Sequence, residues 1–103
     1  MSEGKYKTRL TKKIERRFPG CLVLRNDSSY IQGIPDILVL FGNCWAALEA
    51  KISAKAEVQP NQPYYVDRMN SMSFAAFIHP DNEEEVLDAM EQAFAAGWHT
   101  RVS

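Results

Sequence analysis

The stretch GIPDILVLFGNCWAALEAK, residues 33–51, is expected to decide the fold. Two apolar runs in it flank Gly42-Asn43, and a Gly-Asn pair between apolar runs is a recognised β-hairpin connection. Because a strand turns successive side chains to opposite faces, Glu49 and Lys51 point the same way, and the hairpin brings Asp36 beside them. The sequence therefore predicts two carboxylates and one ammonium group in a shared pocket.

These three charged groups indicate metal-dependent hydrolysis of a phosphodiester. Carboxylates are the hard oxygen ligands that suit Mg²⁺ or Mn²⁺, and a nearby lysine can orient a water or offset charge on phosphate. Asp36 opens a buried strand and Glu49 lies between Leu48 and Ala50, where an unpaired charge is costly unless a metal binds it. The alternatives are a solvated Asp36 and a same-face ion pair of Glu49 with Lys51 on an exposed strand.

Periodicity and turn signals place the remaining elements around this hairpin. We expect helices at 5–18, 63–69 and 82–97, and strands at 21–25, 36–41, 44–52 and 73–79. A last edge strand at 98–102 is a further, optional element. The order αβββαβα predicts an α/β (α+β) fold in which helices flank a mixed β-sheet.

Length and composition indicate one soluble domain. The 103 residues suffice for a single core, so one domain spanning 1–103 is expected. The longest strongly apolar run, 37–41, is too short to cross a bilayer, and the N-terminus has no apolar signal region, so we expect a cytoplasmic protein without a membrane partner. Cys21 and Cys44 lack metal-ligand spacing and are expected to be reduced thiols.

The formal net charge of -1 hides a strong asymmetry, because residues 1–25 hold eight Lys or Arg against two Glu. A local positive surface is what nucleic acid binding requires, although a solvated helix face is the alternative explanation. The candidate nucleic-acid-binding residues of the first helix are Lys5, Lys7, Arg9, Lys12, Lys13, Arg16 and Arg17.

Pro35-Asp36, Glu49-Ala50-Lys51 and the order of helices and strands together resemble the PD-(D/E)xK nuclease superfamily. Within it, residues 33–36 and the Gln59-Pro60-Asn61-Gln62 that opens a helix are most similar to the stand-alone VRR-NUC nucleases of phages and their Holliday junction resolvase relatives. The resemblance covers residues 5–95 and implies a restriction-endonuclease-like core.

The resemblance also implies roles for individual residues. Asp36 and Glu49 would be metal ligands, joined by the backbone carbonyl of Ala50. Lys51 would position the attacking water and stabilise charge on the phosphorane.

Two further site residues follow from related nucleases. Glu15, next to the core position Ile14, would be a metal ligand on the first helix, and its alternative is a surface ion pair with Lys12. Gln62 would be the site glutamine that holds water or phosphate, and Gln59 is its competitor.

Three residues outside the first helix are further candidates for contact with nucleic acid. Ser29 and Tyr30 lie in the loop that leads to Asp36, where turn chemistry alone would also explain the serine. Tyr64 could stack on a base, although adjacent tyrosines such as Tyr64 and Tyr65 are more often one core and one surface residue.

The expected protein is therefore a Mg²⁺- or Mn²⁺-dependent DNA endonuclease that uses a metal-activated water. The resemblance implies a branched substrate such as a Holliday junction, and paired cuts would require a homodimer. It also suggests a phage-encoded enzyme that acts in the host cell. The alternatives are a catalytically silent nucleic-acid- or partner-binding module, a nuclease that cuts flaps, nicks or ordinary duplex, and a sequence-specific restriction-type nuclease.

Overall fold

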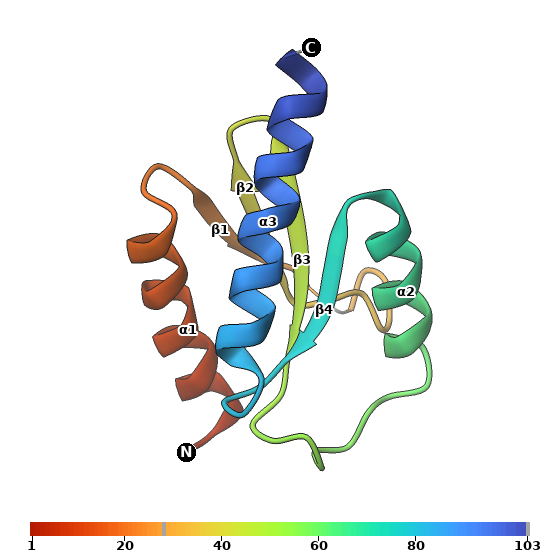
Figure 1. Ribbon diagram of the computed structural model, residues 1–103. Helices are drawn as coiled ribbons and strands as arrows, with labels where there is room; N and C mark the ends of the chain where they lie inside the picture. The colour runs from red at the N-terminus through yellow and green to blue at the C-terminus, as the bar shows by residue number, and fades with distance from the viewer. Residues whose placement is uncertain (28, 103) are drawn as a thin grey trace.

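Four strands form one mixed sheet in the part of the chain that the structure describes (Figure 1). The computed structural model describes residues 1–27 and 29–102, with side chains described through Gly97. The strands are β1 (Leu22–Arg25), β2 (Ile37–Phe41), β3 (Cys44–Ala50) and β4 (Phe74–Ile78), which neighbour one another in that order. The pairs β1–β2 and β2–β3 are antiparallel, and β3–β4 is parallel.

The helices are α1 (Glu3–Arg17), α2 (Gln62–Met72) and α3 (Glu83–Val102). The order of elements is therefore αβββαβα, and the predicted α+β class with a mixed sheet flanked by helices is confirmed. The central hairpin also forms as expected, with Gly42 in the left-handed region at φ 62°.

The edge strand predicted at 98–102 is wrong, because α3 continues through Gly97 to Val102. Glycine inside a helix costs only about 1 kcal/mol relative to alanine, and Gly97 does not adopt the left-handed conformation that ends helices. Its small size has a packing reason: a Cβ there would lie 3.3 Å from Sγ of Cys44.

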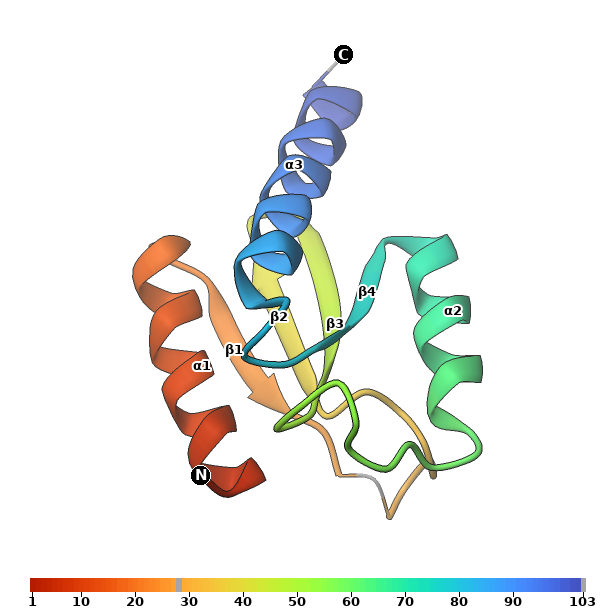
Figure 2. The same cartoon turned by 60° about the horizontal axis from the view of Figure 1, so that its bottom comes forward.

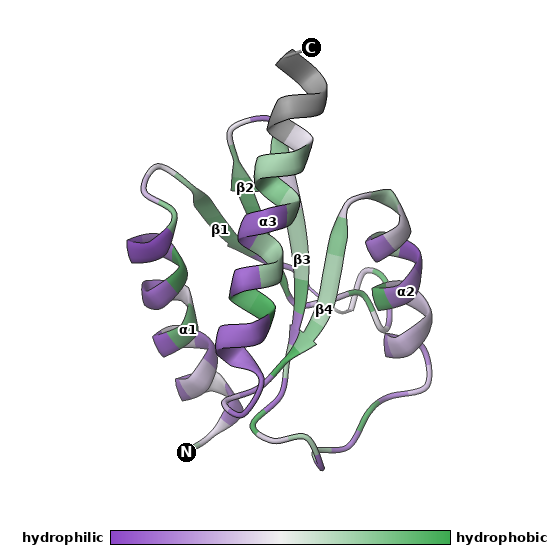
Figure 3. Cartoon of the chain, in the orientation of Figure 1, coloured by the Kyte–Doolittle hydropathy of each residue, from purple (hydrophilic) through white to green (hydrophobic). Residues whose placement is uncertain are grey.

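One core lies between the sheet and the helices α1 and α3. On α1 the core residues Tyr6, Leu10 and Ile14 follow the predicted fourfold spacing, and Figure 3 shows the apolar side of this helix turned toward the sheet. The other main members of this core are Phe18, Ile37, Val39, Ala46, Leu48, Ala50, Ile78, Val86, Leu87, Met90 and Phe94.

The second face of the sheet is covered only in part. Ala47 and Ala75 alternate away from the core and are still buried, and α2, the crossover between the parallel strands, contacts β3 and β4. On β1, Leu22 and Leu24 remain 61% and 43% exposed. Among the described residues, no helix is long and apolar enough to span a membrane.

An ion-pair network ties α1 to α3 and changes the interpretation of two basic residues. Lys13 bonds to Glu83 at 2.6 Å and to Glu84, and Arg17 bonds to Asp88 and, at 3.1 Å, to Glu91. Acidic partners therefore neutralise both cations. The expectation that Lys13 and Arg17 track a nucleic acid backbone is not supported, because they join helices.

Glu83 is the buried centre of this network. Its Oε1 accepts a hydrogen bond from the Tyr6 hydroxyl at 3.0 Å, while Lys13 bonds to Oε2. Burial, reinforced by the Glu83 carboxylate, raises the pKa of Tyr6 above its ordinary value. The network fixes the position of α1 against α3, and with it the α1 side chains that reach the end of the sheet.

Candidate active site

The register of the β2–β3 hairpin places Asp36 opposite Glu49. The last ladder pair is Ile37 with Leu48, so the residue before β2 comes next to the residue after Leu48. Asp36 Oδ1 accepts a hydrogen bond from the backbone N–H of Ala50 at 3.2 Å. The carboxyl group of Asp36 is thus held at the end of β3, where the sequence predicted it.

Glu49 is buried, with 3% of its surface exposed. Its Oε1 has no hydrogen-bond partner among the described residues, and its Oε2 lies 3.8 Å from Nζ of Lys51. Burial, followed by the negative charge of Asp36, raises the pKa of Glu49 to about 7, against the opposing charges of Lys51 and Lys7. A buried carboxylate with a free oxygen is costly in a protein interior, so Glu49 lacks the partners that a structural role would supply.

Lys51 brings a positive charge to the site, and Gln62 holds its ammonium group in place. The Lys51 ammonium, on a residue 7% exposed, donates to Gln62 Oε1 at 2.9 Å and to the backbone carbonyl of Glu57 at 3.0 Å. Gln62 Oε1 also accepts the backbone N–H of Gln59 at 2.9 Å. The structure therefore places the side chain of Gln62 against Lys51, whereas Gln59 contributes backbone only.

Lys7 reaches the site from α1, which the sequence analysis did not anticipate. Its Nζ lies 2.5 Å from Asp36 Oδ2 and 3.4 Å from Glu3 Oε1. Burial alone would lower the pKa of Lys7, but the hydrogen bond and charge of Asp36, together with Glu3, raise it. Lys7, proposed as a nucleic-acid contact, is thus engaged with a candidate metal ligand. The Glu3–Lys7 spacing of four residues is the only signal in the sequence for this arrangement.

No hydrogen bond or ion pair joins Glu15 to Asp36, Glu49 or Lys51 among the described residues, and its assignment as a metal ligand stays a prediction. Glu15 is exposed and close enough to Cys21 to raise the pKa of that thiol, after the larger effect of burial. Eight residues separate Glu15 from Lys7, which is about 12 Å along a helix. The first-helix carboxylate near the site is Glu3, whose charge contributes to the raised pKa of Glu49.

Two loops meet beside the site (Figure 2). Gly33, at φ 93°, packs so closely on Asn61 that an added Cβ would lie 2.8 Å from the Asn61 carbonyl carbon. This contact joins the loop before Asp36 to the start of α2, where Gln62 lies.

The three remaining candidates for nucleic-acid contact are exposed around these loops. Ser29 donates through N and Oγ to Asp27, as turn chemistry predicted. Tyr30 is 87% exposed and Tyr64 is 57% exposed, with the Tyr64 ring edge-on to Tyr65.

Four basic residues of α1 lie on its exposed surface at spacings of four, three and four residues, which places them along one side of a helix. We call this set the α1 basic stripe; it consists of Lys5, Arg9, Lys12 and Arg16. Among the seven basic residues proposed for nucleic-acid binding on this helix, these four are exposed, although Arg9 also lies 3.9 Å from Oε1 of Glu83.

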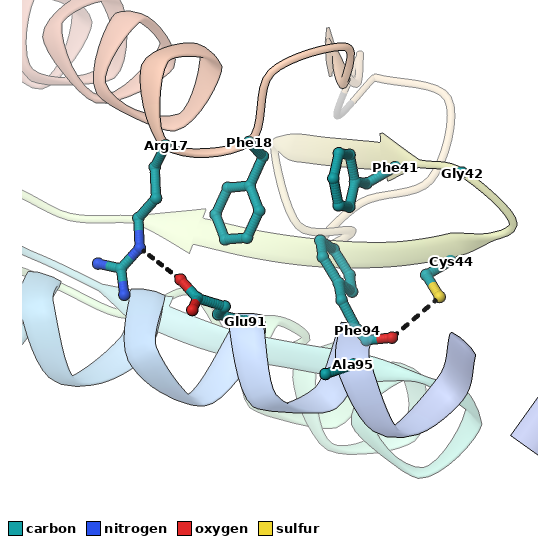
Figure 4. Close-up of a pocket in the computed structure, with 8 residues that line it drawn as sticks. All are labelled: Arg17, Phe18, Phe41, Gly42, Cys44, Glu91, Phe94 and Ala95. Carbon is teal, nitrogen blue, oxygen red and sulfur yellow. Dashed lines mark hydrogen bonds and ion pairs between the residues drawn. The ribbon is translucent and has the colours of Figure 1, made fainter. Parts of the chain in front are cut away.

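A pocket lined by aromatic rings is separate from these charged groups. It has a volume of about 580 Å³ and opens between the end of α1, the β2–β3 turn and α3 (Figure 4). Phe18, Phe41 and Phe94 line it with their rings, and the Arg17–Glu91 ion pair lies at its side. Its lining supplies no pair of carboxylates, so the pocket is not the candidate active site.

The donor set at the end of β3 fits a hard divalent cation. It comprises the free Oε1 of Glu49, the carboxylate of Asp36 and the backbone carbonyl of Ala50 between Glu49 and Lys51. Among the described residues, no group of three or more His, Cys, Asp or Glu side chains could hold a metal ion. Mg²⁺ commonly binds through one or two carboxylates and keeps several waters, so two carboxylates are sufficient for it.

No protein-family model matches the chain, and comparisons with curated proteins and with solved structures find no match either. Function is therefore inferred from the geometry of the site.

Proposed function

We propose that this chain is a metal-dependent nuclease of the PD-(D/E)xK type, in which a single domain hydrolyses phosphodiester bonds. The observation that carries the proposal is the Glu49 carboxylate, buried opposite Asp36 and with Oε1 unpaired among the described residues. The Lys51 ammonium lies 3.8 Å from Oε2 and leaves Oε1 without a partner among the described residues, and a buried unpaired carboxylate oxygen is costly unless a metal ion binds it. Beside Glu49, Lys51 can stabilise negative charge on a phosphate, and Gln62 orients the Lys51 ammonium group through a hydrogen bond.

The residues divide into a metal-binding and a phosphate-binding side. Asp36, Glu49 and the Ala50 carbonyl would hold Mg²⁺ or Mn²⁺, which supplies charge stabilisation at phosphate and lowers the pKa of bound water. Gln62 and the Glu57 carbonyl fix the Lys51 ammonium close to Glu49, so Lys51 can orient the nucleophile and stabilise the developing phosphorane charge. Gln62 is a positioning residue because it acts through Lys51.

DNA is the proposed substrate. The α1 basic stripe supplies exposed cations for phosphates, and Ser29, Tyr30 and Tyr64 lie on the loop and helix that border the site. Such contacts bind the backbone and not the bases, so recognition would depend on DNA shape and salt more than on sequence.

Branched DNA, such as a Holliday junction, is the substrate that the family resemblance favours. Two cuts in one junction require two sites, so a homodimer is part of the proposal, and the exposed leucines of β1 offer an apolar surface for it. A cytoplasmic location and a phage origin accompany this proposal, and the phage origin rests on the resemblance.

The direct test is cleavage of labelled DNA by the purified chain. A four-way junction, a linear duplex and a single strand are incubated with Mg²⁺, Mn²⁺ or EDTA. The matched variants are Lys51→Ala and Lys55→Ala, which remove a buried and an exposed lysine from neighbouring positions.

We expect metal-dependent cuts that Lys51→Ala abolishes and Lys55→Ala retains. Symmetric cuts in the junction alone would support the dimeric resolvase, and cleavage of every substrate would leave a nuclease without junction selectivity. DNA binding without cleavage in either metal would contradict the enzyme and favour the silent module.

A further inference from the structure

Both oxygens of the Asp36 carboxylate are occupied by groups of the chain itself. Oδ1 accepts the Ala50 N–H at 3.2 Å, and Oδ2 lies 2.5 Å from the Lys7 ammonium. The Asp36 and Lys7 side chains are 15% and 19% exposed, so solvent competes little for this contact. A metal ion that coordinates Oδ2 would have to take the position of the ammonium group.

We propose that Lys7 is a built-in competitor of the divalent cation, which metal binding displaces from Asp36 so that its ammonium group can bind a DNA phosphate. This inference rests on the proposed function, because it assigns a role to a residue of the same site. Lys7 would hold the site together before metal binds and would become a substrate contact afterwards.

The charges around the site favour such an exchange. With Glu49 ionised, Glu3, Asp36 and Glu49 give three negative charges against the two positive charges of Lys7 and Lys51. A divalent cation bound to Asp36 and Glu49 would reverse this sign and repel the Lys7 ammonium.

Glu3 defines where the displaced ammonium group can go. It lies one turn away on α1, 3.4 Å from Lys7, and its side chain is 44% exposed. It would therefore retain Lys7 at the rim of the site when Asp36 no longer does. Lys7 is two residues from both Lys5 and Arg9, so it lies on the other side of α1 from the α1 basic stripe, and the released cation would be a phosphate contact separate from that row, at the site itself.

Two consequences separate this mechanism from a structural salt bridge. Removal of the Lys7 charge should tighten metal binding, whereas removal of a merely structural partner should loosen it. Metal should also strengthen DNA binding through Lys7, and coupling between two ligands is reciprocal, so DNA should strengthen metal binding to the same extent.

The first measurement is calorimetric titration of the DNA-free protein with Mn²⁺. We compare the wild type with Lys7→Met, which keeps the aliphatic stem, and with Lys5→Met, which removes an exposed lysine two positions away on α1. A unit-charge pair about 4 Å apart contributes about fivefold to an equilibrium even in water. We expect Lys7→Met to bind Mn²⁺ about fivefold tighter, and Lys5→Met to bind it as the wild type does.

The second measurement is the affinity for a duplex in EDTA and in Ca²⁺, an oxygen-seeking ion used here in place of Mn²⁺. Lys7→Met should match the wild type in EDTA, where Asp36 occupies Lys7, and should bind more weakly than the wild type in Ca²⁺. Lys5→Met should lose the same factor in both buffers. Lys7→Gln serves as a second neutral variant, and thermal unfolding confirms that each protein is folded.

Weaker or unchanged Mn²⁺ binding in folded Lys7→Met and Lys7→Gln would overturn the inference, and so would an equal loss of DNA affinity in EDTA and Ca²⁺. A wild type that binds and cleaves with metal would leave the proposed nuclease intact in that case. A wild type that binds no Mn²⁺ at all would overturn both.

Discussion

Replacement of Glu49 by glutamine isolates the energetic effect of the buried charge. Glu49→Gln keeps the size of the side chain but cannot ionise. In the wild type, the protein disfavours the ionised form of Glu49 and raises its pKa from 4.5 to about 7. An acid with a raised pKa binds its proton more tightly in the native state than in the unfolded chain. Its contribution to stability is therefore fully present below pH 4.5 and is lost as pH rises through 7.

The size of the effect follows from the shift in pKa. Each unit corresponds to about 1.4 kcal/mol, so the whole contribution is about 3 kcal/mol, of which about 2.5 kcal/mol is lost between pH 5 and pH 8. Between pH 5 and pH 8 in EDTA, we expect the unfolding free energy of the wild type to fall further than that of Glu49→Gln, and the difference between the two falls to be about 2.5 kcal/mol. Urea denaturation of both proteins at the two pH values measures this difference. The contributions of the other ionisable groups are the same in the two proteins and cancel when the variant is subtracted from the wild type.

Metal should reverse the order of stability. At pH 8 in EDTA the glutamine variant should be more stable than the wild type, because it buries no charge. Millimolar Mg²⁺ should stabilise the wild type and leave the variant unchanged, because only the native site of the wild type binds the ion. The exposed Glu57→Gln, on the loop over Lys51, is the matched control and should follow the wild type in each condition.

A lower stability of Glu49→Gln than of the wild type at pH 8 in EDTA would refute this reasoning. It would mean that Glu49 is chiefly the counter-ion of Lys51, 3.8 Å away, and that the buried ammonium suffers from its loss. The free Oε1 would then be incidental, and the site would be a structural ion pair.

Three further predictions concern the loops, the positioning of the lysine and the DNA surface. Gly33→Ala should destabilise the fold by at least about 1 kcal/mol more than Gly20→Ala in urea denaturation, because both glycines have φ 93° but only the first would press a Cβ against Asn61. Gln62→Leu should lower kcat about tenfold while the calorimetric Kd for Mn²⁺ stays the same, because it removes one hydrogen bond to Lys51 and no metal ligand. DNA binding should weaken on the order of a hundredfold between 50 and 200 mM salt if the α1 basic stripe makes four phosphate contacts, and a flat salt dependence would exclude that surface.

The hairpin and the pairing of its carboxylates could be predicted because their signals are local. Gly42-Asn43 fixes the turn, and the turn fixes the register, so the position of Asp36 opposite Glu49 follows from counting along two strands. Strand alternation then brings Lys51 to the side of Glu49. No knowledge of tertiary packing is needed for these steps.

The roles of the α1 side chains could not be predicted, because they depend on partners far along the chain. Lys13 meets Glu83 across 70 residues of sequence, and nothing in the basic run separates it from the exposed Lys12. Glu15 was assigned to the site because it follows a core residue. Periodicity predicts which side of a helix is buried, but it does not predict which helical turn lies next to Asp36 and Glu49. Docking of α1 against α3 decides that Lys7 reaches Asp36.

The same docking bears on the choice between an enzyme and a silent module. A module that only binds DNA would need the α1 basic stripe and the fold, and neither depends on Glu49. At neutral pH the ionisation of Glu49 opposes folding by about 3 kcal/mol, which is a large part of the stability of an ordinary domain. A residue that weakens the fold by this amount is expected where activity requires it, since a neutral side chain of the same size would improve stability at no loss of binding. The silent module therefore predicts that Glu49→Gln is a pure gain, more stable and equal in DNA affinity with or without Mg²⁺. The nuclease predicts that the gain in stability comes with the loss of every response to metal.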